Sequence, residues 1–514
     1  MKTKLFVLLL LVVSSRAQTG PFTATGNMTT PRENHTATLL FDGTVLIAGG
    51  DNYTNGAMEQ PRMASAEIYD PVARTFTQVG DMTTGRSGHT ATLLPDGRVL
   101  IAGGDGTTQS GSDPAIPGTA ELYDPSIRSF ATTGRMVTGR TGANATLLTN
   151  GKVLITGGIA GYENDNDNDT VFIGDAEIYD PSTGTFIPAA GYVGNLSSMV
   201  SSEWFDSTST RLADGTVLFA SESAAEIYDP VTGAFSLRGS MATRSGNYLL
   251  GRTASLLMDG KVLLAGGEQE DTGLYNNAEL YDAATGVFSF TGAMTIPRYE
   301  HTSTLLPDGT VLIAGGITYT CVSPCLLGSG DFFGSEDNSE LYDPLQGAFT
   351  AAGSMTQRRR SHTATLLNDG DVLVAGGDGW VYGASFGSSA TAELYHPASP
   401  VPAPLLFSLS GDGRGQGAIW YTATGLLASS QNPAAVGEIV ATYTTSLFEG
   451  GTIPPQVAIG GKLAEILYFG DAPGYPGYFQ VNFRVQNGVA PGSGVPVRLT
   501  YLSRPGNAVT IGVQ

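Results

Sequence analysis

The sequence predicts an all-β protein, in which a seven-bladed β-propeller is followed by a smaller β-sandwich. One phrase recurs along most of the chain, reading RSGHTATLLPDGRVLIAGG at Arg86–Gly104 and RYEHTSTLLPDGTVLIAGG at Arg298–Gly316. Repeats of roughly 40–50 residues with four strand-like segments each are typical of propeller blades. The 514 residues include 69 glycines, and only 14% are charged. Together with the lack of helical periodicity, this composition suits one large all-β domain and a smaller one.

The chain begins with a segment that is typical of a secretory signal peptide. Basic residues precede the apolar run Leu5–Val13, and the small residues Ser15 and Ala17 follow it. We therefore expect residues 1–17 to be removed on export, leaving a secreted or cell-surface protein. The apolar run is too short to cross a bilayer, so we expect no membrane insertion.

The net charge limits the classes of partner. Removal of Lys2, Lys4 and Arg16 would lower the formal charge from −21 to −24. An acidic protein repels phosphate backbones and anionic lipids, so we do not expect nucleic acid as a partner. An extracellular glycan or protein ligand remains, and the oligomeric state stays open.

Seven tight turns count the blades of the propeller, which we expect over residues 18–397. Asp-Gly and Asn-Gly tolerate the positive φ of tight hairpins and would join the first two strands of each blade. These dipeptides occur at Asp42–Gly43, Asp96–Gly97, Asn150–Gly151, Asp214–Gly215, Asp259–Gly260, Asp308–Gly309 and Asp369–Gly370.

The amino terminus is expected to close the ring. A phenylalanine marks the fourth strand of six blades, but prolines follow Tyr395 in the seventh and cannot sustain a strand ladder. The missing copy is FTATGNM at Phe22–Met28, which matches FTQVGDM at Phe76–Met82. An amino-terminal strand would complete the seventh blade and remove a free sheet edge.

The carboxy-terminal part differs from the repeats. A proline-rich linker over residues 398–406 precedes short strand-like segments over residues 407–514, which favour a β-sandwich. Gln456–Phe469 is one such segment. The phrases PAAVGEIV, QVAIGG and GSGVPVRLTYL resemble an immunoglobulin-like (Ig-like) domain found at the carboxy terminus of many secreted bacterial proteins.

The propeller repeats resemble kelch repeats, with Gly-Gly after the second strand, a tyrosine in the third and an aromatic residue in the fourth. The Arg-x-x-His-Thr-x-Thr-Leu-Leu-x-Asp-Gly form is similar to the propeller of galactose oxidase and related secreted copper radical oxidases. The resemblance covers about Phe22–Pro397. It implies a seven-bladed kelch propeller, a fold that serves both enzymes and binding modules.

The galactose oxidase resemblance also raises the question of copper. Such enzymes hold copper on two histidines and two tyrosines, one of which is cross-linked to a cysteine. The sixth repeat resembles part of this pattern with Tyr299, His301, Cys321 and Cys325, but Glu300 stands where the tyrosine is expected. No third cysteine exists for the cross-link if Cys321 and Cys325 form a disulfide, as export favours. We therefore do not expect copper, and no cofactor is required.

Strand direction places the tight turns on one face of the propeller and the long loops on the other. Long loops on a rigid scaffold are where binding and catalysis concentrate. The candidate binding residues on this long-loop face depart from the repeat or lie near the channel. They are Trp204, Arg252, Tyr299, His301, Trp380 and Tyr382. Exposed aromatic side chains there would stack on sugars or anchor a protein, and the alternative is that they pack inside the fold.

Two further patterns leave alternatives open. His35, His89, His301 and His362 share one repeat position, where they either bind a metal or bond to the backbone of the neighbouring blade. Asp165, Asp167 and Asp169 alternate with asparagines in one loop, which suits either Ca²⁺ or a solvated acidic loop.

The function that these patterns favour is recognition. We expect a secreted protein that binds a carbohydrate or a protein partner on its long-loop face. A galactose oxidase-like copper oxidoreductase is the alternative, and whether the chain is an enzyme at all stays open.

Overall fold

The computed structural model describes the chain with several gaps. The described residues are 21–53, 62–106, 118–163, 169–189, 208–220, 224–242, 249–269, 273–320, 332–379, 387–399 and 401–514. Their regular structure consists of β-strands, so the predicted all-β class is confirmed. These residues contain no helix that is long and apolar enough to span a membrane. The expected signal peptide over residues 1–17 lies outside them.

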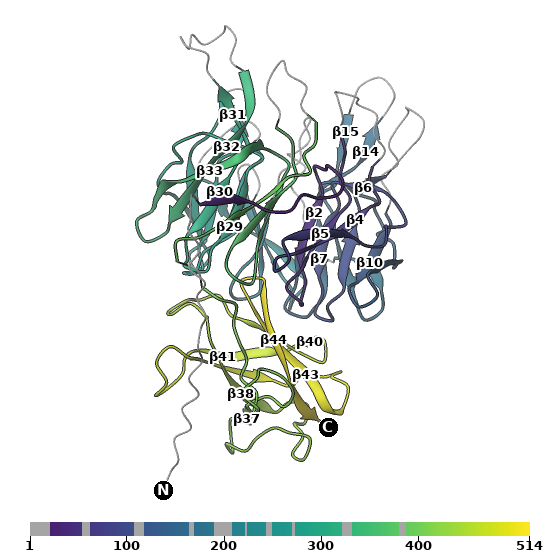
Figure 1. The fold of residues 1–514 in the computed structure, drawn as a ribbon, viewed down its shortest axis with the longest axis vertical. Helices are drawn as coiled ribbons and strands as arrows, with labels where there is room; N and C mark the ends of the chain where they lie inside the picture. The colour runs from purple at the N-terminus through teal and green to yellow at the C-terminus, as the bar shows by residue number, and fades with distance from the viewer. Residues whose placement is uncertain are drawn as a thin grey trace.

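Seven antiparallel blades, each with four main strands, form the propeller (Figure 1). In blade 6 a fifth strand, β31 (Ile317–Thr320), pairs with an extension of the third strand. The strands of each blade are given from the innermost outward. Blade 1 contains β2 (Thr36–Leu39), β3 (Val45–Ala48), β4 (Ala66–Asp70) and β5 (Thr75–Gln78), and blade 2 contains β7 (Thr90–Leu93), β8 (Val99–Ala102), β10 (Ala120–Asp124) and β11 (Ser129–Thr132). Blade 3 contains β12 (Asn144–Leu147), β13 (Val153–Thr156), β16 (Ala176–Asp180) and β17 (Thr185–Pro188), and blade 4 contains β18 (Thr208–Arg211), β19 (Val217–Ala220), β20 (Ala224–Asp229) and β21 (Ala234–Ser240). Blade 5 contains β23 (Thr253–Leu256), β24 (Val262–Ala265), β27 (Ala278–Asp282) and β28 (Val287–Phe290). Blade 6 contains β29 (Thr302–Leu305), β30 (Val311–Ala314), β32 (Phe332–Asp343) and β33 (Ala348–Arg359), and blade 7 contains β34 (Thr363–Leu366), β35 (Val372–Ala375), β36 (Ala392–Tyr395) and β1 (Phe22–Ala24).

Each blade is held by the repeated apolar residues that the sequence shows. The second strand, such as β3, is buried along its whole length, because neighbouring blades cover both of its faces. The tyrosine of the third strand lies opposite the phenylalanine of the fourth, and in blade 1 the rings of Tyr69 and Phe76 are 4.8 Å apart. Such tilted aromatic pairs stabilise the outer half of a blade.

The amino-terminal strand closes the ring as predicted. β1 pairs antiparallel with β36, and Phe22 lies opposite Tyr395 with the two rings 5.0 Å apart. The Thr23 hydroxyl is also hydrogen-bonded to His396 Nε2 at 2.7 Å. The seventh blade therefore joins the two ends of the propeller sequence.

Two four-stranded antiparallel sheets form the carboxy-terminal unit. One sheet contains β37 (Ile419–Tyr421), β38 (Ile439–Thr444), β42 (Phe479–Arg484) and β41 (Glu465–Asp471), and the other contains β40 (Lys462–Leu463), β39 (Gln456–Ile459), β43 (Gly492–Tyr501) and β44 (Arg504–Val513). Both sheets contribute to one apolar core, so the predicted β-sandwich is confirmed, while its Ig-like character stays a prediction.

One sandwich segment differs from the sequence prediction. Gln456–Phe469 is not one strand but three, β39, β40 and β41. Gly460 and Gly461 have φ values of 54° and 77° and form a tight turn after β39. The chain then crosses to the other sheet, so the apolar run serves both sheets.

The sandwich docks on the tight-turn face of the propeller. Thr452 N–H donates to Met258 O at 2.8 Å, and the Arg498 guanidinium donates to Phe41 O at 2.9 Å and stacks on the Phe41 ring. Met258 and Phe41 each directly precede an Asp-Gly turn. Figure 1 shows the short strands β14 (Ile159–Glu163), β15 (Asp169–Phe172) and β31 (Ile317–Thr320) at the opposite end of the propeller.

Candidate functional site

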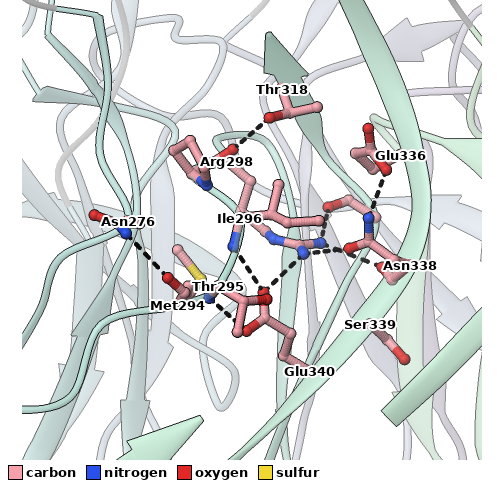
Figure 2. A network of polar contacts seen from close by, with 12 residues as sticks. Asn276, Met294, Thr295, Ile296, Arg298, Thr318, Glu336, Asn338, Ser339 and Glu340 are labelled. Atoms are coloured by element: carbon pink, nitrogen blue, oxygen red, sulfur yellow. Dashed lines mark hydrogen bonds and ion pairs between the residues drawn. The ribbon is translucent and has the colours of Figure 1, made fainter. Parts of the chain in front are cut away.

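A buried arginine organises the long-loop end of five blades. Figure 2 shows Arg298 of blade 6 beside Asn338 and Glu340. Arg298 donates to Gly315 O at 2.8 Å, to Asn338 O at 3.2 Å and to Glu340 Oε1 at 3.0 Å. The second Glu340 oxygen accepts the Thr295 N–H at 2.8 Å. The equivalent pairs are Arg32–Glu67, Arg86–Glu121, Arg140–Glu177 and Arg359–Glu393. These ion pairs join the end of the second strand to the third strand, so the rim of the channel is rigid.

Blades 4 and 5 depart from this pattern. Arg252 stands at the histidine position of blade 5, yet it reaches into the blade and pairs with Glu279 at 3.3 Å. It is only 8% exposed, so the structure places this predicted ligand-binding residue inside the blade rather than on its surface. In blade 4 the equivalent glutamate, Glu226, has one oxygen without a hydrogen-bond partner among the described residues. Arg32 stands four residues before the first strand of blade 1, and the residue four before the first strand of blade 4 is Trp204.

The repeated histidines hold neighbouring blades together. The Nε2 atom of each contacts the first-strand threonine hydroxyl of the preceding blade, and for His301 this is Thr253 at 2.9 Å. The other pairs are His35–Thr363, His89–Thr36 and His362–Thr302. The partner is thus a threonine side chain and not the backbone that the structural alternative proposed. Any side chain at Gly266 would meet the His301 ring, since a Cβ there would lie 2.8 Å from Cε1.

Burial keeps these imidazoles neutral. Desolvation, with the charge of the nearby core arginine, lowers the pKa of His89, His301 and His362 to about 3. The pKa of His35 is well below its ordinary value for the same reasons. A neutral, buried and hydrogen-bonded imidazole suits a structural role.

The residues present do not fit a copper site built on two histidines. All five histidines of the chain are described: four are buried between blades, and the fifth, His396, contacts Thr23 and Asp371 at the outer part of blade 7. Tyr299 hydrogen-bonds Glu268 and packs on Gly251. Within the described ranges, no group of three or more His, Cys, Asp or Glu side chains could hold a metal ion.

Short backbone pairings build the channel mouth on the long-loop face. The residue after the core arginine pairs with the residue after Gly-Gly, for example Glu33 with Asp51 and Arg360 with Asp378. Two of these pairings are strands, β6 (Arg86–Ser87) with β9 (Asp105–Gly106) and β22 (Leu249–Leu250) with β25 (Glu268–Gln269). They extend the first two strands beyond the Gly-Gly bend, so their side chains surround the propeller axis.

Ion pairs link adjacent blades around the mouth. Arg62 contacts both Asp51 of blade 1 and Asp105 of blade 2. The Ser87 hydroxyl donates to Asp51 at 2.6 Å, and the Thr141 hydroxyl donates to Asp105 at 2.9 Å. This part of the mouth is a continuous polar surface across blades 1 to 3.

A second group of charges lies on the other side of the ring. Arg360 donates through Nε to Asp378 at 2.8 Å and lies 3.6 Å from a Glu300 oxygen. Glu33 is 6% exposed and accepts the Ser388 hydroxyl at 3.1 Å. Desolvation and the nearby Asp378 carboxylate raise the pKa of Glu33 to about 7. Among the described residues, carboxylates outnumber arginines at the mouth.

The structure leaves most of the sequence-predicted anchors untested. Trp204, Trp380, Tyr382, Asp165, Asp167, Cys321 and Cys325 lie outside the described residues. The backbone of Asp169 begins β15 and pairs with Glu163. Aromatic stacking, calcium binding and the disulfide therefore stay predictions.

Comparisons with known proteins support the fold. The structure is similar to that of a fungal alcohol oxidase of the AA5 family in complex with copper, with 17% sequence identity and a TM-score of 0.59. The match covers 96% of this chain and 99% of that one. A structure of YjhT matches 71% of this chain and 95% of that one at 15% identity, and its TM-score of 0.44 is too low to carry an argument. No protein-family model and no curated protein matches the sequence.

Proposed function

We propose that this chain is an exported recognition protein that binds a glycan or a protein ligand at its channel mouth. One observation carries the proposal. The polar network of Arg62, Arg360 and their carboxylate partners varies from blade to blade, whereas a purely structural element would repeat. The docked sandwich contacts the opposite, tight-turn face.

The chemistry of the mouth suits hydroxyl-bearing or basic ligand groups. Carboxylates such as Asp51 and Asp378, fixed by arginines, accept hydrogen bonds in a defined geometry. Because carboxylates are in excess, the mouth attracts a basic partner more than an acidic one. Trp204, Trp380 and Tyr382 are the proposed aromatic anchors in the adjoining loops.

A copper oxidase is the second candidate, because the fungal neighbour was solved with copper. The structure gives the repeated histidines little room for such a site. Their Nε2 atoms contact threonine hydroxyls, and their Nδ1 atoms are buried, although they have no hydrogen-bond partner among the described residues. The buried, threonine-bonded histidines support recognition as the first candidate, and the copper-bound fungal neighbour supports oxidation as the second.

The test is a glycan and protein array probed with the full mature chain, followed by affinity measurements on its hits. We expect Asp51→Asn and Arg360→Ala to weaken binding at least about tenfold, as losses at central interface residues commonly do. Arg414→Ala, on an exposed turn of the sandwich, is the matched control and should bind normally. Hits that bind both mouth variants as tightly as the wild type would overturn the proposed site, and the absence of any hit would overturn the proposed function.

A further inference from the structure

A cavity lies on the propeller axis at the end that the sandwich covers. Its volume is about 640 Å³, and first-strand residues of all seven blades line its wall. Ile453, Pro454 and Gln456 of the sandwich are among the residues that cap it. This axial cavity is therefore formed by both domains together and is separate from the channel mouth.

The lining combines apolar side chains with hydroxyl groups and is almost without charge. Hydroxyl groups come from residues that include Thr38, Thr92, Ser209, Thr304, Thr365 and Thr500. Among the described lining residues, Arg211 alone has an ionisable side chain. The axial cavity thus has one positive charge within a ring of hydroxyls.

Arg211 is a departure from the repeat. It ends the first strand of blade 4 opposite Val217, as Leu39 lies opposite Val45 in blade 1. The other six blades have leucine at this position: Leu39, Leu93, Leu147, Leu256, Leu305 and Leu366. A single basic residue in an otherwise apolar position of the repeat is an asymmetry that the scaffold itself does not require.

The guanidinium of Arg211 has neutral partners. It donates to Leu147 O at 3.0 Å and contacts the side-chain amide of Gln456, whose oxygen faces it in the favourable amide orientation. No ion pair to it is found among the described residues, whereas each core arginine of the blades pairs with a glutamate. Burial lowers the pKa of Arg211 with no opposing charge. A partly buried charge without a counter-charge is unfavourable, and a bound anion would compensate it.

We propose that the axial cavity binds a small hydroxylated carboxylate, such as a sugar acid, with its carboxylate on Arg211. Leu147 O and the Gln456 amide use both Nη1–H groups and one Nη2–H group of Arg211, which leaves Nε–H and the second Nη2–H. This pair can donate two parallel hydrogen bonds to a carboxylate, and the threonine and serine hydroxyls suit the ligand's own hydroxyl groups. The volume lies within the range of small-molecule sites. The site is independent of the channel mouth, so either proposal can fail without the other.

The experiment is calorimetric and thermal titration of the full mature chain with glucuronate, with glucose, sulfate and phosphate as comparison probes. We expect glucuronate to bind and to raise the melting temperature, and glucose to do neither, because a ligand that binds the folded state stabilises it by mass action. Arg211→Leu should abolish the response, while Arg414→Leu, which removes the same charge from the surface, should retain it.

A structural role alone makes the opposite prediction for stability. If Arg211 only clamps the two domains, Arg211→Leu lowers the melting temperature without any ligand, and glucuronate has no effect on the wild type. Under our proposal, Arg211→Leu restores the repeat residue and melts at or above the wild-type temperature when no anion is present. Arg211→Gln, which removes the charge and keeps hydrogen-bond donors, provides a second variant should the leucine form fail to fold. Equal glucuronate binding by the wild type and a charge-free variant, or a response to sulfate or phosphate but not to glucuronate, would overturn the proposal.

Discussion

Acidification should unfold this propeller through its four repeated histidines. In the folded state the pKa is about 3 for His89, His301 and His362 and well below 6.5 for His35, whereas an unfolded histidine has an ordinary value of about 6.5. The unfolded chain therefore takes up protons below pH 6.5 that the folded chain does not. The free energy of unfolding falls as the pH falls through 6.5, and the loss continues until the folded groups titrate near pH 3.

The magnitude is large relative to the stability of a typical protein. Each such histidine lowers the free energy of unfolding by about 1.4 kcal/mol for every pH unit below 6.5, so at pH 5 the four together lower it by about 8 kcal/mol. Glu33 opposes this: its folded pKa of about 7 exceeds its ordinary 4.5, so its protonation stabilises the fold as the pH falls from 7 to 4.5. At pH 5 that gain is about 3 kcal/mol. Glu226, Glu268, Glu300 and Glu336 act in the same direction as Glu33, because desolvation raises their pKa as well. The net loss is therefore smaller than the histidine contribution, which by itself is comparable to the whole stability of many domains.

Urea unfolding followed by near-UV circular dichroism between pH 8 and pH 5 measures this slope. His89→Ala is the informative variant, because blade 3 has Ala143 at the same position and still closes. We expect the variant to be less stable than the wild type at pH 7.5 and to have a pH slope smaller by about a quarter of the histidine contribution, since three protons replace four. A wild-type stability that stays constant from pH 7 to pH 5, or an identical slope in both proteins, would refute the reasoning.

Three further outcomes follow from the same contacts. Deleting residues 20–28 removes β1 and leaves β36 as a free edge, so the melting temperature of the propeller should fall; an unchanged cooperative transition would contradict ring closure by this strand. Arg298→Met leaves Glu340 buried and unpaired and should destabilise the fold by about 3–5 kcal/mol, whereas the double variant with Glu340→Gln should recover part of that loss in a double-mutant cycle. Trp204→Ala and Trp380→Ala should each lower the affinity for any ligand found by more than about tenfold in direct titrations, with little change in melting temperature. Normal binding by both variants would show that these tryptophans are not anchors.

The sequence predicts the fold well because every blade of a propeller repeats the same pattern of turns and buried residues. Seven Asp-Gly or Asn-Gly turns, one in each repeat, predict seven blades, and the FTATGNM phrase at the amino terminus predicts the closing strand. The sandwich prediction is less exact, because Gly460–Gly461 breaks an apolar run that reads as one strand.

The site is harder to predict, because its contacts join residues that are distant in sequence. Arg298 and Glu340 are 42 positions apart, and an insertion of variable length separates such partners in each blade. Arg252 stands at the histidine position, so its inward pairing with Glu279 is not evident from the repeat. The threonine partners of the histidines did have a signal, since Thr follows the histidine position in six of the seven repeats, and Thr36, Thr253, Thr302 and Thr363 are the ones that contact a histidine.

Copper stoichiometry tests the structural role of the histidines most directly. The full mature chain is equilibrated with excess copper and dialysed, and its metal content is then measured by elemental mass spectrometry for the wild type and for His301→Ala. Because the repeated histidines are buried and bonded through Nε2 to threonines, we predict less than stoichiometric copper in both proteins and a lower melting temperature for His301→Ala. One tightly held copper per wild-type chain, lost in His301→Ala at an unchanged melting temperature, would contradict the structural role and favour an oxidase.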